Sequence, residues 1–152
     1  MKNKDGIQAL NDLITINNDR IECYKTALEI TKDRDLKTLF LQFISNSQKC
    51  KQELDSEIKA LGGKSTNNTK TTGKFFRVWM DVKAAYTGKY RKSILNSCEY
   101  AEYKTKEIYI KIIVNQYEYL SSKQRDIINT QILFLNKDYD HIKLLQESPL
   151  VA

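Results

Sequence analysis

The chain has one proline and one histidine among its 152 residues, and these scarcities limit the folds and the functional sites that it can form. The proline is Pro149, near the end of the chain, so no proline before it interrupts a helix. No segment approaches the ~20 apolar residues of a membrane span, and the opening MKNKDGIQALNDL lacks the apolar run of a signal peptide. We therefore predict long uninterrupted helices in a soluble cytoplasmic protein without a membrane span.

The sequence motifs of several enzyme classes are also missing. There is no glycine-rich phosphate loop, no Cys-x-x-Cys pair and no serine-nucleophile motif with a nearby histidine. A cysteine nucleophile is conceivable, because Cys98 and His141 could face each other across two helices. A buried thiol in a bundle core is usually inert, however, so we expect a protein without catalytic activity.

Cysteine usage and charge point to an ordinary soluble protein. Cys23, Cys50 and Cys98 are widely spaced and fall within helical patterns, which predicts buried thiols in a reducing compartment. The 25 Lys and Arg residues against 19 Asp and Glu give a net charge of +6. Because the charges are interspersed, they indicate solvated helix surfaces and no specific nucleic-acid site.

The apolar spacing predicts four long helices, at about residues 5–32, 34–61, 90–119 and 122–147 of a single domain. Asp33 is placed to cap the second helix, Gly62-Gly63 to end it, and Ser121-x-x-Gln124 has the form of a capping box. The apolar stripes of the first three helices are Ile7, Leu10, Ile14, Asn17, Ile21, Tyr24 and Leu28; Leu36, Phe40, Phe43, Ser47, Cys50, Leu54 and Leu61; and Ile94, Cys98, Ala101, Thr105, Ile108 and Ile112.

The segment 62–89 between the two helix pairs is long enough to run the length of a bundle. Its first part is polar, and Phe75, Trp79, Val82 and Tyr86 then repeat at the spacing of a short amphipathic helix, about 74–86. We expect this helix to cover the bundle; binding to a membrane surface or a partner is the alternative. The connection permits two antiparallel hairpins with parallel second and third helices, which is the ferritin-like topology.

A candidate metal site lies on the fourth predicted helix, where Asp138-x-x-His141 places an acid and the only histidine on one face. Both align with Ile127, Gln131, Phe134 and Leu145, so we expect both to face inward. In the ferritin-like topology they lie level with Glu22, Glu99 and Glu102, and carboxylates with histidine bind iron or another divalent metal in such bundles.

The second predicted helix argues against a complete two-metal site. Its level segment, residues 43–50, contains neither a carboxylate nor a histidine. A single metal ion, held by Glu99 or Glu102 with Asp138 and His141, is one alternative. The other is a buried polar network in which His141 and the acids satisfy one another, with Tyr24 or Tyr103.

Several segments together resemble a known family. They are Leu10 to Tyr24, Asp33 to Phe43, Gly62-Gly63, Trp79 to Lys83 followed by Thr87-Gly88, Cys98-Glu99-x-x-Glu102, and Asp138-x-x-His141-Ile142. The chain is similar over nearly its whole length to a bacterial four-helix-bundle family of unknown function within the ferritin-like superfamily. The resemblance implies a ferritin-like bundle and brings no established activity; a stress-related role follows only by analogy with the superfamily.

Two hypotheses for function follow. We favour a non-catalytic bundle that works by association, as a homodimer or with a protein partner, because the tyrosines exceed what one bundle can bury. The alternative is a metal-binding redox or storage protein that uses Glu22, Glu99, Glu102, Asp138 and His141. Seven of the nine tyrosines fall on or between the last two predicted helices: Tyr90, Tyr100, Tyr103, Tyr109, Tyr117, Tyr119 and Tyr139.

Overall fold

A computed structural model describes residues 2–69 and 90–148, which form four long helices. They are α1 (Lys2–Ile30), α2 (Arg34–Ala60), α4 (Tyr90–Asn115) and α5 (Ser122–Glu147), with a short 3-10 turn, η1 (Tyr117–Tyr119), before α5. The described residues contain no strand, so the predicted all-α class is confirmed. The helix predicted at about 74–86 and its proposed membrane or covering role lie outside the described residues.

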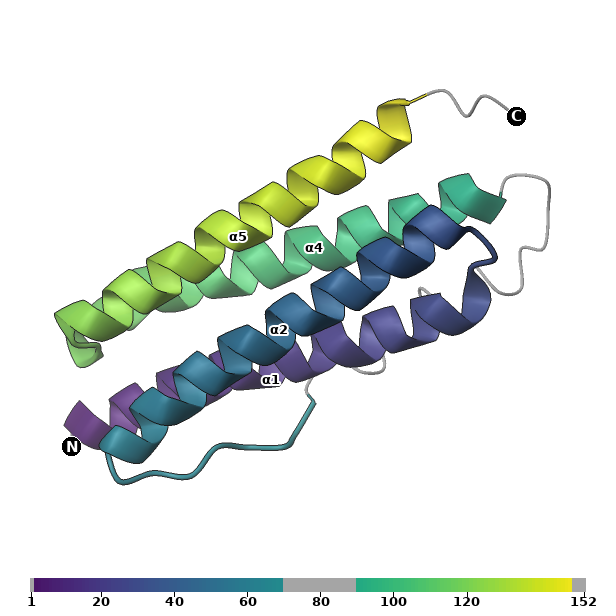
Figure 1. Cartoon of the computed structure of the whole chain (residues 1–152). Coiled ribbons are helices and arrows are strands. Elements are labelled where there is room, and N and C mark those ends of the chain that lie inside the picture. The colour runs from purple at the N-terminus through teal and green to yellow at the C-terminus, as the bar shows by residue number, and fades with distance from the viewer. Residues whose placement is uncertain (1, 70–89, 149–152) are drawn as a thin grey trace.

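The helices form two antiparallel hairpins that pack into one bundle (Figure 1). In the first hairpin α1 packs on α2, and in the second α4 packs on α5. The two hairpins meet mainly where α1 contacts α4, while α5 makes a smaller contact with α2. Figure 1 shows α2 and α4 running in the same direction, which is the predicted parallel arrangement of the second and third helices. None of the described helices is long and apolar enough to cross a membrane.

The buried residues follow the predicted stripes closely in the first three helices. Leu10, Ile14, Asn17, Ile21 and Tyr24 of α1 are buried, and only the ends of that stripe are partly exposed. In α2 the buried stripe includes Leu36, Phe40, Phe43, Ser47, Cys50 and Leu54, and in α4 it includes Ile94, Cys98, Ala101, Thr105 and Ile112. Each helix therefore turns its apolar side toward the centre of the bundle.

The helix ends agree with the sequence signals, with two differences. Ser121 caps α5 in a capping box with Gln124, and Gly62, with a φ of 80°, follows the end of α2, as expected. Asp33 stands at the start of α2, but its carboxylate accepts from Arg91 at 2.9 Å instead of capping the helix. The third helix ends at Asn115, four residues earlier than predicted, because residues 117–119 tighten into η1.

Candidate functional site

The centre of the bundle holds an ion-paired cluster around Arg20 of α1, which is 2% exposed. Its guanidinium donates from Nε to Glu102 Oε2 at 2.9 Å and from Nη2 to Glu102 Oε1 at 2.5 Å. Nη2 also lies 2.8 Å from Asp138 Oδ2, and Nη1 donates to Ser47 Oγ at 3.0 Å. We call Arg20, Ser47, Glu102 and Asp138 the arginine cluster. It takes one side chain from each of the four helices.

Electrostatics explain how this charged cluster persists in the core. Burial works against the charge of Arg20, but Glu102 and Asp138 outweigh it, so the pKa of the guanidinium is raised. Burial raises the pKa of Glu102, although the hydrogen-bonded guanidinium opposes this shift. Two aromatic rings complete the surroundings, because the guanidinium carbon lies 5.5 Å from the Tyr24 ring centroid and 5.0 Å from that of Phe43. The cluster therefore pairs both of its carboxylates with a single guanidinium.

The structure brings together two of the five predicted metal ligands, Glu102 and Asp138, and it does so around a guanidinium. Glu22 is exposed on α1, with its carboxylate 3.7 Å from Lys25. Glu99 accepts from Gln146 at 2.7 Å and from Lys143 at 3.3 Å, and these contacts, led by Gln146, lower its pKa. Within residues 2–69 and 90–148, no group of three or more His, Cys, Asp or Glu side chains could hold a metal ion.

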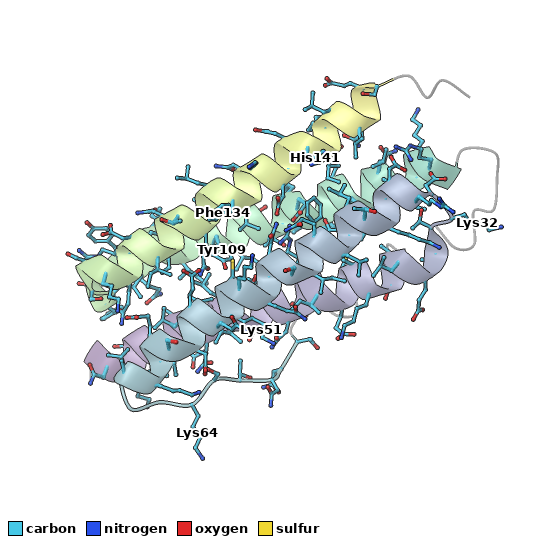
Figure 2. All side chains as sticks on the ribbon, in the orientation of Figure 1. Lys32, Lys51, Lys64, Tyr109, Phe134 and His141 are labelled. Atoms are coloured by element: carbon cyan, nitrogen blue, oxygen red, sulfur yellow. The ribbon has the colours of Figure 1, made fainter. Side chains whose placement is uncertain are left out.

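The prediction that Asp138 and His141 both face inward is wrong for His141. Asp138 is buried, while His141 on the same helix is exposed (labelled in Figure 2). The next buried residue after Asp138 is Ile142, four residues on, because the steps of four and three along the buried stripe come in the order opposite to the predicted one. The buried residues of α5 are Gln124, Ile128, Gln131, Leu135, Asp138 and Ile142, whereas Phe134 is 55% exposed.

A second polar cluster crosses the bundle about one to two helical turns from the first. Asn17 Nδ2 donates to the hydroxyl of Tyr109 at 2.7 Å, and that hydroxyl donates to Gln131 Oε1 at 2.7 Å. Gln131 Nε2 in turn donates to the backbone oxygen of Cys50 at 3.3 Å and to Glu53 Oε1 at 3.1 Å. Figure 2 shows Tyr109 between the two hairpins. We call Asn17, Tyr109, Gln131 and Glu53 the tyrosine chain.

A groove with a volume of about 400 Å³ lies between α2 and α5. Glu53, the last member of the tyrosine chain, lines it, and Phe134 forms the wall on α5. Asn46 also lines it and donates to Asp138 Oδ2 at 3.2 Å. The groove is thus linked to the tyrosine chain directly and to the arginine cluster through Asn46.

Sequence reasoning missed Arg20, the central residue of the cluster. Arg20 lies beside the apolar stripe, three residues after Asn17 and four before Tyr24, both of which were assigned to the core. That spacing is the signal that could have identified it, since residues three and four apart share a helix face. The described residues contain a buried polar network, but Arg20 holds its two acids, and the predicted member His141 is exposed and takes no part in it.

Fold and cluster together define an all-α four-helix bundle whose polar interior is held by an internal arginine. The chain belongs to the family described as Domain of unknown function (DUF2383), whose model matches residues 5–115. The match covers α1, α2 and α4 and ends before α5, which carries Asp138. No curated protein matches the chain. The predicted resemblance to a family of unknown function is thus confirmed, while its ferritin-like ancestry and bacterial source stay predictions.

Proposed function

We propose that this protein is a non-catalytic bundle that works by self-association through the outer face of its second hairpin. The observation that supports this most directly is the distribution of exposed apolar side chains. Nine large apolar residues are exposed in the described part of the chain, and only Leu41 belongs to the first hairpin. The other eight are Tyr100, Tyr103, Ile110, Val114, Tyr117, Leu133, Phe134 and Leu144.

Helical spacing places several of these residues in two stripes, one on each helix of the second hairpin. Tyr103, Ile110 and Val114 are seven and four residues apart on α4, so they form a stripe along one side of that helix. Leu133 and Leu144 are separated by eleven residues on α5 and lie roughly opposite its buried stripe. We call these five residues the outer face. Apolar residues grouped in this way typically mark an interaction surface.

The surroundings of the outer face suit a second copy of the same chain. A hollow of about 290 Å³ lies between α4 and α5 beside Tyr100, Tyr103 and Tyr139, and it can receive an apolar side chain. Exposed Glu107 and Asp140 alternate with exposed Lys111 and Lys137. A surface with both knobs and a hollow, and with both charge signs, is self-complementary, as a two-fold interface requires.

Charged substitutions on the outer face test this proposal. Val114→Glu and Leu133→Glu should each weaken dimerisation by about tenfold or more, because each places a carboxylate in an apolar contact. Sedimentation equilibrium over a concentration series gives the dissociation constant. Leu41→Glu is the matched control, since Leu41 is 58% exposed but lies on α2. A wild-type protein that stays monomeric at its highest soluble concentration would contradict the proposal.

Metal binding is the second candidate, and one observation supports it: Glu102 and Asp138 converge on a shared cation in the core. If iron or another divalent metal binds, Glu22, Glu99 and His141 would have to move toward these two carboxylates. Elemental analysis after incubation with ferrous iron under air, with His141→Ala in parallel, tests it. We expect no stoichiometric metal in either sample, because both carboxylates already bond to Arg20 and a metal ion would have to displace it. Metal present in the wild type and lost in the variant would reverse this preference.

A further inference from the structure

Both helices of the α1–α4 contact carry a buried cysteine, Cys23 on α1 and Cys98 on α4. The contacts between Arg20 and Glu102 bring the two helices together at one level, with the shortest distance 2.5 Å. Cys23 follows Arg20 by three residues, and Cys98 precedes Glu102 by four. Because α1 and α4 run in opposite directions (Figure 1), both steps lead toward the same end of the bundle. They measure about 4.5 and 6 Å at 1.5 Å per residue, so the two cysteines lie nearly level.

The packing around the pair permits a close approach of the two helices. Cys23 and Cys98 are 3% and 0% exposed, and each lies one turn from a residue of the arginine cluster, on the same face of its helix. Their buried neighbours Ala27 on α1 and Ser97 and Ala101 on α4 are small. Electrostatics agree with this proximity: burial raises the pKa of Cys98, and the charge of Cys23 adds to the shift. Cys50 belongs to α2, beside the groove.

We propose that Cys23 and Cys98 are a redox-sensitive pair that closes into a disulfide and joins the two hairpins covalently. The oxidant is a small disulfide of the glutathione class. The thiolate of one cysteine attacks a sulfur of that disulfide and releases one glutathione thiol; the second protein thiolate then attacks the mixed disulfide and releases the other. Two protein thiols are oxidised and one glutathione disulfide is reduced to two thiols. Since both cysteines are buried, closure requires a local opening of the α1–α4 contact and is slow.

The test is peptide mapping of the native full-length protein after incubation with oxidised glutathione. Remaining thiols are then alkylated under denaturing conditions, and the digest is analysed without reduction. We expect a peptide pair linked through Cys23 and Cys98, with a mass decrease of about 2 Da for the whole chain. Cys50 should be recovered in its alkylated form.

Single-cysteine variants provide the controls. Cys50→Ser should leave the bridge and its rate of formation unchanged, and Cys98→Ser should abolish it. The wild-type map decides the question even if Cys98→Ser folds poorly. Recovery of Cys23 and Cys98 as separately alkylated or separately glutathionylated residues would overturn the proposal, as would a bridge that includes Cys50. A bridge between chains would also overturn it, and gel mobility without reductant detects that outcome.

Discussion

Replacing Arg20 with methionine is expected to lower the free energy of unfolding by about 3–5 kcal/mol, the cost of breaking a buried ion pair by removing one partner. The substitution keeps most of the side-chain volume but leaves Glu102 and Asp138 without their shared cation. Urea unfolding followed by circular dichroism measures the loss. Because burial raises the pKa of Glu102, lower pH favours the neutral acid in the folded variant. The deficit should therefore shrink as the pH falls and grow as it rises through that pKa.

A triple variant separates the loss of a cation from damage to packing. Arg20→Met combined with Glu102→Leu and Asp138→Leu removes the stranded carboxylates together with their partner. Replacing a whole buried ion-pair cluster with apolar residues is often neutral or stabilising, so most of the stability should return. If the triple variant is as unstable as the single one, the volume of Arg20 and its contacts with Tyr24 and Phe43 matter more than its charge.

The sequence predicts which acidic residues lie at one level of the bundle, but it does not predict which residue they contact there. Glu102 and Asp138 share a level, as counting along helices in the ferritin-like topology indicates, because helix rise is nearly constant. Their partner could not be read from periodicity in the same way, since Arg20 is long and lies at the edge of the stripe. The stripe predicts only which residues point inward and leaves open how far a side chain reaches across the core.

The misplacement of His141 has a different physical origin. A helix has 3.6 residues per turn, so an inward stripe alternates steps of three and four, and the order of the steps fixes its phase. In α5 the buried residue after Asp138 is Ile142, a step of four. His141 therefore lies outside the buried stripe and is exposed. Gln131 and Asp138 belong to both the predicted and the observed stripe. The predicted one adds Ile127, Phe134 and Leu145 and the observed one adds Ile128, Leu135 and Ile142, so hydrophobicity alone could not choose between the two phases.

The bonds made by Arg20 and the position of the exposed apolar residues bear on the choice between metal binding and association. A metal centre needs carboxylate oxygens that are free to ligate the ion, and Glu102 and Asp138 are both bonded to Arg20. An association surface needs apolar area that the fold does not cover, and the second hairpin has most of it among the described residues. The arginine cluster joins all four helices, and the outer face is the surface for which we propose association.

Alkaline pH is expected to unfold the protein steeply, beginning near pH 9 and continuing through pH 11, because four buried acids resist ionisation. Burial, more than any neighbouring charge, raises the pKa of Cys50 from its ordinary 9.0 to about 11. Burial likewise holds the pKa of Cys98, Tyr24 and Tyr109 well above their ordinary values. Folded pKa values above unfolded ones mean that the unfolded chain loses these protons first. Stability is therefore complete below the unfolded pKa values and falls as the pH rises.

Urea unfolding at a series of pH values measures the slope of this loss. Each buried acid that is ionised only in the unfolded chain contributes about 1.4 kcal/mol per pH unit. Tyr109→Phe removes one such group, so above pH 10 its slope should be smaller than that of the wild type by about that amount. At neutral pH the same variant should be less stable by about 1–3 kcal/mol, because Asn17 and Gln131 lose the hydroxyl that joins them. The two effects have opposite signs, so the curves of wild type and variant should converge with rising pH, and parallel curves would show that Tyr109 ionises equally well in the folded chain.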